Sequence, residues 1–350
     1  MTLTGRATHA VKSALAHTLY ALGLLQLWQS VALRRKAVVL MYHRVLTADE
    51  RRRSGSHPAI IVDRATFAKQ MALLKRRFTV LSQDEFARCI ESRTPFPDSA
   101  CLITFDDGWA DNYTNALPEL EKQGLPAVVF LPVHFVGTRR MFWRESLTQV
   151  LMRMAGEVRR DPARREQVRA LLAPAGLERL ADIGDGDPRT AVLDAIDSRK
   201  DLALEHEALP ATLARELGID LAATSGADAF LDWPQAVAMS RRGVAFGGHG
   251  AEHRLLTHVT PAEADAEMAA ASAVIAEKLG ARAESFSYPN GNWTPAIAAR
   301  VRAHGYRLAF TTEPGPVEST VDPFAIRRLN VHEDSTGSEA LFLARLVGLL

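Results

Sequence analysis

The chain has 350 residues, 47% of them hydrophobic, so it can bury a large core and is not disordered throughout. Its 42 Lys and Arg residues balance 41 Asp and Glu residues, which argues against a nucleic-acid partner because such a partner requires a broad basic surface. The two cysteines, Cys89 and Cys101, are too few for a disulfide framework or an all-cysteine zinc site, and we expect both to be packed inertly.

The N-terminal segment 1–36 is apolar at its centre. Residues 14–33 contain no charged side chain, and the basic run 34–36 follows directly. This length could span a bilayer, but polar residues interrupt it and positive charges flank both ends. We predict a helix that packs on the protein or lies along a membrane surface. A membrane anchor and a cleaved signal, with 30–32 as the cleavage motif, are the alternatives.

After residue 36, short apolar runs alternate with helical patterns, which is typical of βα units around a parallel sheet. The predicted strands are residues 37–42, 100–105, 127–131, 244–247, 284–288, 308–312 and 325–331. The predicted helices are a segment with Phe67, Met71 and Leu74 on one face, then 112–123, 261–279 with Thr260 as its cap, and 294–303. The pattern indicates an α/β barrel or an open doubly wound sheet.

One stretch interrupts this alternation. Between residues 137 and 231 the sequence is rich in Arg, Glu, Asp, Ala and Leu and contains no strand pattern. We therefore predict a helical insertion at 137–231 that separates two parts of one barrel, 37–136 and 232–350.

Polar side chains follow the predicted strands at the points where they end. They are Tyr42-His43, Asp106-Asp107-Gly108, His249 to His253, Tyr288-Pro289-Asn290-Gly291, and His332-Glu333-Asp334. The carboxyl ends of parallel strands meet at one edge of a sheet, where α/β enzymes bind their ligands. We expect the functional site at this edge.

Two of these groups have the chemistry of a metal site. His249 and His253 are four residues apart, so a single helical turn would bring both imidazoles to one face. Two histidines with one aspartate leave positions open for water and substrate, as in catalytic metal sites. Glu252 does not directly follow the first histidine, so the zincin motif is absent. The alternatives are a simple turn for Asp106-Asp107-Gly108 and surface positions for the histidines.

Together, three strings carry a resemblance to a known family. TFDDG at 104–108, HGAEH at 249–253 and YPNG at 288–291 resemble the first three motifs of the polysaccharide deacetylases, the NodB-homology or carbohydrate esterase 4 domain. The run LMYHRV at 40–45 further resembles the branch that de-N-acetylates poly-N-acetylglucosamine-type exopolysaccharides. The resemblance covers about 37–136 and 231–331.

The resemblance implies a distorted (β/α) barrel that hydrolyses N-acetyl groups of an amino sugar with one divalent metal ion, for which we expect zinc. Asp107, His249 and His253 would hold the ion. Asp106 would be the general base that deprotonates the attacking water, and Tyr288 would line the oxyanion pocket, through its backbone N–H.

The proton donor to the leaving amine is predicted from the same resemblance. His43 is the first choice, because the early Tyr-His motif supplies this acid in the exopolysaccharide branch. His332 is the second, since its motif is one residue longer than the family pattern. The arginine expected before the third motif is not evident, and Arg282, Arg327 or Arg328 could orient Asp106 instead.

Two other functions remain open at this stage. A two-carboxylate glycosidase would need acids on either side of a glycosidic bond, whereas Asp106 and Asp107 are adjacent. A carbohydrate-binding module that has lost turnover would not need an open metal site. The expected partners are an N-acetylated glycan and, through the N-terminal helix, a membrane surface. The expected location is cytoplasmic or associated with the inner membrane, with a secreted or periplasmic location as the alternative.

Overall fold

The computed structural model describes residues 3–183, 188–198, 208–220 and 228–350. Contacts divide the chain into two compact units. The barrel unit comprises Met1–Arg51, Pro58–Thr138 and Phe230–Leu350. The insert unit comprises Arg52–His57 and Arg139–Ala229.

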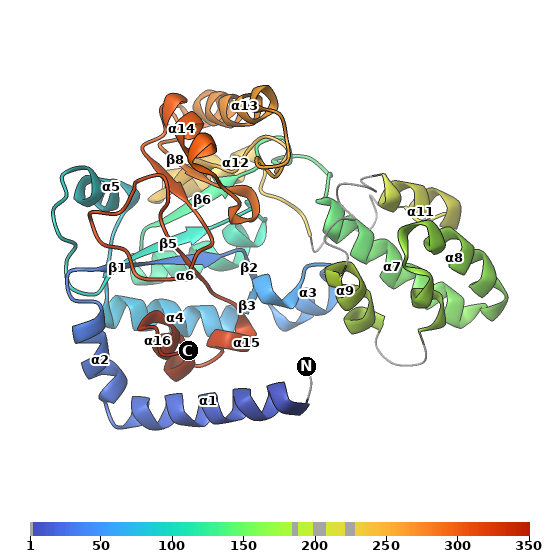
Figure 1. Cartoon of the computed structure of the whole chain (residues 1–350), viewed down its shortest axis with the longest axis horizontal. Helices are drawn as coiled ribbons and strands as arrows, with labels where there is room; N and C mark the ends of the chain where they lie inside the picture. The colour runs from blue at the N-terminus through green and yellow to red at the C-terminus, as the bar shows by residue number, and fades with distance from the viewer. Residues whose placement is uncertain (1–2, 184–187, 199–207, 221–227) are drawn as a thin grey trace. The chain divides into compact units, whose positions relative to one another are not determined.

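The barrel unit is built on an eight-stranded parallel sheet (Figure 1). Its strands are β1 (Ala37–Tyr42), β4 (Thr79–Val80), β5 (Ala100–Phe105), β6 (Ala127–Leu131), β7 (Val244–Gly248), β8 (Ser285–Ser287), β9 (Leu308–Phe310) and β10 (Leu329–Asn330). Their order is β10-β1-β5-β6-β7-β8-β9, with β4 beside β5. Two further strands, β2 (Arg44–Leu46) and β3 (Ile61–Asp63), form a separate parallel pair.

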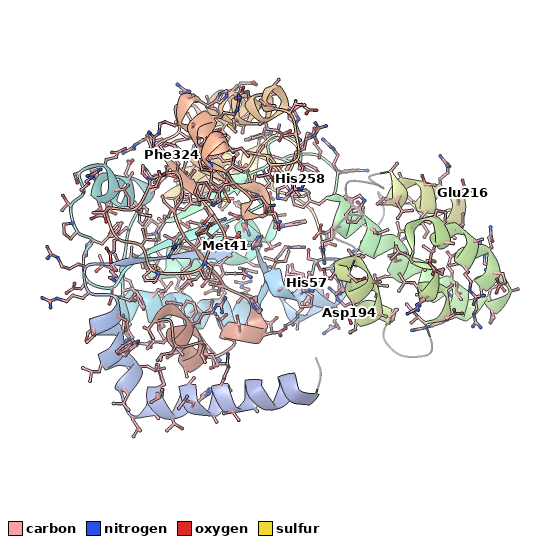
Figure 2. All side chains as sticks on the ribbon, viewed as in Figure 1. Met41, His57, Asp194, Glu216, His258 and Phe324 are labelled. Atoms are coloured by element: carbon pink, nitrogen blue, oxygen red, sulfur yellow. The ribbon has the colours of Figure 1, made fainter. Side chains whose placement is uncertain are left out.

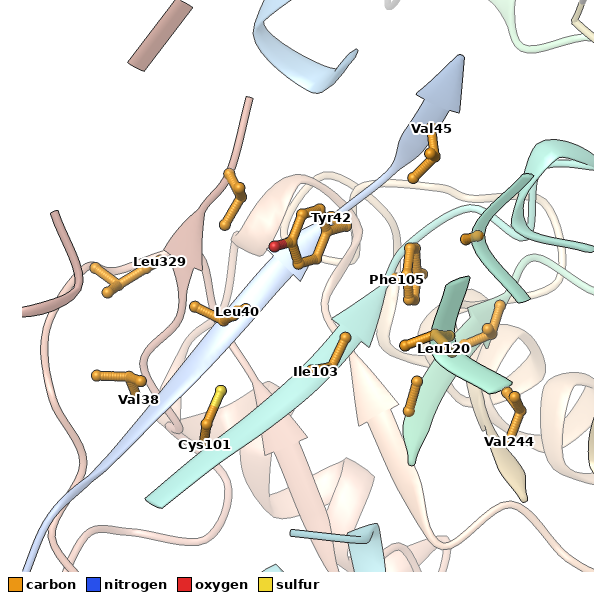
Figure 3. Close-up of a cluster of buried hydrophobic side chains, with 14 of the residues drawn as sticks. Val38, Leu40, Tyr42, Val45, Cys101, Ile103, Phe105, Leu120, Val244 and Leu329 are labelled. Carbon is orange, nitrogen blue, oxygen red and sulfur yellow. The ribbon is translucent and has the colours of Figure 1, made fainter. Parts of the chain in front are cut away.

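Both faces of the sheet are buried. Alternate side chains of β1 and β5 lie together on one face, namely Val38, Leu40 and Tyr42 with Cys101, Ile103 and Phe105 (Figure 3). The opposite face joins Val39 of β1 to Phe130 of β6 and Phe310 of β9 in a second cluster. Because β1 and β9 are far apart in the strand order yet share this cluster, the sheet is curled, which confirms the predicted distorted barrel.

The last predicted strand, 325–331, is shorter than expected. Ile326 forms an isolated bridge to Phe310, its N–H bonding Ala309 O at 3.0 Å, whereas β10 pairs with β1. One segment thus hydrogen-bonds both edges of the sheet. It cannot remain a regular strand throughout because it passes from one edge to the other.

The helices of the barrel unit surround this sheet. They are α4 (Arg64–Arg77), α5 (Gln83–Glu91), α6 (Leu117–Gln123), α12 (Trp233–Ser240), α13 (Pro261–Leu279), α14 (Pro295–Ala303), α15 (Glu333–Thr336) and α16 (Glu339–Leu346), and α3 (Ala48–Arg53) runs into the insert unit. Single 3-10 turns lie at Pro58–Ile60 and Pro289–Gly291. Helix α13 has the predicted bounds and the predicted cap at Thr260. The predicted helix 112–123 instead begins with a π-helical turn, Asn112–Ala116.

The N-terminal segment forms two helices rather than the single one predicted. Helix α1 (Leu3–Ala21) and α2 (Leu24–Ala32) meet at Gly23, whose φ of 73° is left-handed. Both pack against α16 (Figure 1). Within the described part of the chain, no helix is long and apolar enough to cross a membrane.

The insert unit is helical and has its own core. Its helices are α7 (Trp143–Arg160), α8 (Arg165–Leu172), α9 (Pro188–Ser198) and α11 (Leu209–Leu217), with 3-10 turns at Pro162–Arg164, Ala173–Ala175 and Glu178–Asp182. The segment 52–57 is held to it by Asp228, which accepts from Ser54 Oγ and Gly55 N, both at 2.6 Å. Where the insert leaves the barrel unit, Gly137 N donates to Leu231 O at 2.8 Å.

Candidate metal and catalytic site

The predicted site residues gather at the carboxyl edge of the barrel sheet. Asp106 and Asp107 follow β5, and His249 follows β7. His43 follows β1 and His332 follows β10, each two residues past the paired positions Met41 and Asn330. Parallel pairing brings these strand ends to one edge.

Asp107, His249 and His253 form a group that could hold a metal ion, with ligand atoms all within 4.8 Å of one another. Asp107 Oδ1 lies 3.5 Å from His249 Nε2 and 3.4 Å from His253 Nε2. In a tetrahedral site with metal–ligand distances of about 2.0–2.1 Å, two ligand atoms lie about 3.3–3.4 Å apart. Both distances from Asp107 to the histidines therefore match those of a tetrahedral divalent-ion site.

The two histidines differ in their hydrogen bonds and in their pKa values. The carbonyl of Ser287 accepts a hydrogen bond from His249 Nδ1 at 2.8 Å, which leaves Nε2 facing Asp107. Burial lowers the pKa of His249, but the charges of Asp106 and Asp107 outweigh burial and raise the pKa above its usual value. Burial lowers the pKa of His253 to about 4, and the charge of His249 acts in the same direction.

The segment from His249 to His253 is a loop and not a helical turn, yet the two imidazoles do meet, with ring centroids 4.7 Å apart. The buried carboxylate of Glu267 shapes this loop by accepting from Ala251 N at 2.7 Å and Glu252 N at 2.9 Å. Asp107 (φ 74°) and His253 (φ 57°) both adopt the left-handed conformation. Such backbone strain in non-glycine residues concentrates at functional sites.

The second oxygen of Asp107 is held by Trp109, whose Nε1 donates to Oδ2 at 3.0 Å. Trp109 is fully buried and stacks on Phe230, with ring centroids 4.5 Å apart. The guanidinium of Arg44 lies over the indole ring, 4.2 Å from its centroid. The ring therefore cannot stack on a sugar. It directs Asp107 Oδ1 toward the two histidines.

Asp106 forms a buried bidentate ion pair with Arg328. The guanidinium donates to Oδ1 and Oδ2, both at 2.7 Å, and Ser287 Oγ donates to Oδ2 at 3.2 Å. Burial raises the pKa of Asp106, but the charges of Arg328 and His249, together with the hydrogen bonds from Arg328, outweigh burial and lower the pKa below its usual value. The carboxylate is therefore ionised at neutral pH.

Of the three candidate arginines, Arg328 orients Asp106. Arg282 donates to the carbonyl of His304, and the nearest acid to Arg327 is Glu313 at 3.8 Å. Both are remote from the aspartate pair.

The two candidate proton donors lie on neighbouring strands. Among the described residues, the buried Nδ1 of His43 has no hydrogen-bond partner. Burial lowers the pKa of His43, while the charges of Asp107 and Asp106 oppose this effect. Asn112 Nδ2 holds the carbonyl of His43 at 2.8 Å. His332 lies at the start of α15, where its carbonyl accepts from the Thr336 hydroxyl at 2.7 Å.

Tyr288 does not provide the predicted oxyanion donor. Its N–H donates to Phe310 O at 3.1 Å, and its hydroxyl donates to Phe324 O at 2.9 Å. The side chain of Tyr288 is fully buried and packs in the core just after β8.

Sequence reasoning missed three supporting residues, Ser287, Glu267 and Asn112, because their roles depend on contacts between elements far apart in the chain. Only Ser287, which directly precedes the third motif, lies next to a recognised signal. Three aromatic side chains close to the motifs in sequence, Tyr113, Trp233 and Trp293, are partly buried against the core. His258 is exposed on the loop after the histidine pair (Figure 2).

Comparisons with known proteins agree with this geometry. The family model described as polysaccharide deacetylase matches residues 93–167 and 206–309. YxkH of Bacillus subtilis (strain 168), which carries the name of a polysaccharide deacetylase, is 19% identical over 312 residues, covering 89% of this chain and 77% of that protein.

Two solved structures share the fold. The Streptococcus pyogenes deacetylase PplD, in complex with acetate, matches with a TM-score of 0.57 at 17% identity, covering 89% of this chain and 98% of that one. IcaB from Ammonifex degensii matches with a TM-score of 0.54 at 19% identity, covering 88% and 97%.

Proposed function

Because the chain belongs to the polysaccharide deacetylase family, whose members hydrolyse N-acetyl amide bonds, we propose that it is a metal-dependent N-deacetylase of an amino-sugar polysaccharide or its precursor. The observation that carries the proposal is the placement of an ionised carboxylate, Asp106, directly beside the Asp107–His249–His253 group. These are a general base and a cation site on adjacent residues.

Asp107, His249 and His253 would hold the ion, and their histidine-rich donor set favours zinc. A bound divalent cation polarises the acetyl carbonyl and lowers the pKa of water. Asp106 accepts the proton of the attacking water, and its ion pair with Arg328 keeps it deprotonated and oriented.

His43 is the proposed donor of the proton that the leaving amine needs, with His332 as the second candidate. The support for His43 is the Tyr-His run at the end of β1 and the proximity of Asp107 and Asp106, whose charges partly oppose the lowering of its pKa by burial. Comparing His43→Ala with His332→Ala on one acetylated substrate distinguishes them. A larger loss of turnover in His332→Ala would reverse the assignment.

The proposed substrate is a neutral N-acetylated exopolysaccharide. The LMYHRV run at 40–45 supports this class, and PplD was solved with acetate, the product expected here. As part of the same proposal, the enzyme acts in the cytoplasm or at the inner membrane, on a nascent or lipid-linked glycan.

Acetate release from a panel of N-acetylated glycans, with and without a chelator, tests the proposal. We expect release that the chelator abolishes and added zinc restores. Asp106→Asn should retain the ion and lose turnover, whereas Asp107→Asn should lose both. Release that is unaffected by chelation would reject the mechanism. New reducing ends without acetate would indicate a glycosidase, and glycan binding without any product would indicate a binding module.

A further inference from the structure

The N-terminal helices expose an apolar surface that the barrel does not cover. Among described residues, the large hydrophobic side chains that are exposed lie almost entirely here, namely Val11, Leu15, Leu22, Leu24, Leu27, Trp28 and Val31, with Leu349 as the exception. Exposed fractions reach 69% at Val11 and 64% at Leu27. We call these seven residues the apolar face. Large apolar side chains that gather in exposed positions on one segment indicate an interaction surface.

On α2 the exposed apolar residues lie on a different side of the helix from the residues that pack on the barrel unit. Leu24, Leu27, Trp28 and Val31 follow the spacing i, i+3, i+4, i+7 and form one stripe. The residues that pack inward, Leu25 and Gln29, lie on a different side of the helix. Helix α2 therefore has one apolar side for the barrel and a second one for a partner.

The charged side chains of the N-terminal segment itself are of one sign, and acidic residues from later in the chain contact two of its residues: Asp98 Oδ1 accepts from Arg35 N at 2.8 Å and Glu318 pairs with Lys36 at 2.9 Å. Asp49 is the first acidic residue in the sequence, so all charged residues before it are basic. Lys12, Arg34 and Arg35 are exposed, and among the described residues neither Arg34 nor Arg35 forms an ion pair through its side chain. The N-terminal segment thus combines exposed apolar side chains with exposed basic ones, Lys12, Arg34 and Arg35.

From these observations we infer that the apolar face docks on an anionic lipid surface, with α1 and α2 lying in the plane of the interface. Amphipathic helices with basic flanks bind such surfaces by burying their apolar side and attracting acidic headgroups. Trp28 suits an interfacial position, since it is 47% exposed and its Nε1 is satisfied by Val347 O at 3.2 Å. A symmetric dimer through this face would instead bring two basic clusters together.

Co-sedimentation of the purified full chain with vesicles tests this inference. We expect binding to vesicles of phosphatidylcholine with phosphatidylglycerol, weakened by salt, and much weaker binding to phosphatidylcholine alone. Leu27→Gln with Val31→Gln should reduce partitioning by roughly tenfold or more. Arg34→Gln with Arg35→Gln should reduce it roughly thirtyfold. Arg241→Gln with Arg242→Gln, two exposed positions that end α12, makes the same charge change elsewhere and should have no effect.

The outcomes separate this inference from the proposed function, because lipid binding does not depend on the metal site. If the chain binds neither type of vesicle, the inference of lipid docking is wrong. Self-association by light scattering that Leu27→Gln with Val31→Gln abolishes, without lipid binding, would show an interface between copies instead. Circular dichroism of each variant, together with acetate release from a soluble glycan, establishes that any loss of binding is not loss of folding.

Discussion

Trp109 contributes a single polar atom to the metal group, the indole Nε1 that donates to Asp107 Oδ2. Trp109→Phe should keep the stack on Phe230 and remove only this donor. We expect the dissociation constant for zinc to rise about 10- to 100-fold, the usual cost of losing a partner of a metal ligand. Competition with a chromophoric chelator measures this. Trp293→Phe, which removes an indole bond to Glu313 at 3.2 Å, is the matched control, and an equal constant in both variants would contradict the role of Trp109.

The pKa values of the two histidines predict how ion affinity depends on pH. His249 has a pKa raised above 6.5 and must lose its proton to bind an ion, whereas His253, with a pKa of about 4, is already neutral at pH 6. Affinity for zinc should therefore fall as pH decreases through the range below the pKa of His249, by up to about tenfold per pH unit. Titration calorimetry at pH 5, 6 and 7 measures the slope. Affinity that does not change over this range would contradict the assignment of His249 as a ligand.

Individual site residues were predictable from sequence where a motif names them. The aspartate pair and both histidines come together at one edge as expected. Tyr288 was wrongly assigned, because sequence does not reveal that the strand ladder already uses its N–H. Arg328 could only be one of three candidates, since the curl of the sheet decides which arginine faces Asp106.

At the scale of elements, the π-helical turn Asn112–Ala116 fixes the connection that carries His43. Asn112 bonds the carbonyl of His43, and Asn115 Nδ2 bonds the carbonyl of Val45 at 2.9 Å. Such turns widen a helix locally and recur at functional sites. The turn therefore aims two amides at one neighbouring segment.

Asn112→Ala should release the carbonyl of His43 and lower the free energy of unfolding by about 1–3 kcal/mol, because a buried acceptor loses its partner. Turnover should fall while zinc affinity stays near that of the wild type. Urea denaturation and acetate release measure the two effects. Asn292→Ala, which changes a partly exposed asparagine in the same way, is the control. A variant with normal turnover would show that the turn does not position His43.

Elements with strong local signals were predicted with their bounds. Strands β1, β5 and β6 are continuous buried runs of mostly apolar residues, and α13 has a capping box at its start. The interrupted pairing of segment 325–331 and the break between α1 and α2 at Gly23 were not predicted, because neither feature is determined by the neighbouring sequence. The former depends on two sheet edges and the latter on packing against α16.

At the scale of the whole molecule, the barrel unit and the insert unit each have a separate hydrophobic core. The ends of the long insert segment leave the barrel unit beside each other, at the hydrogen bond between Gly137 N and Leu231 O. Replacing residues 139–229 by a short Gly-Ser linker should therefore leave a folded barrel unit that binds zinc. Circular dichroism and metal analysis against the full chain measure this. Loss of both signals would show that the barrel depends on the insert.

The ion pair between Arg328 and Asp106 also has a consequence for biosynthesis. The base belongs to the first third of the chain, and its partner arrives only 222 residues later, near the C-terminus. A nascent chain still on the ribosome contains the aspartates and histidines long before the arginine that keeps the base charged. The growing polypeptide therefore lacks the partner of Asp106 until residue 328 has been synthesised, and chains truncated before Arg328 are expected to lack the proposed turnover.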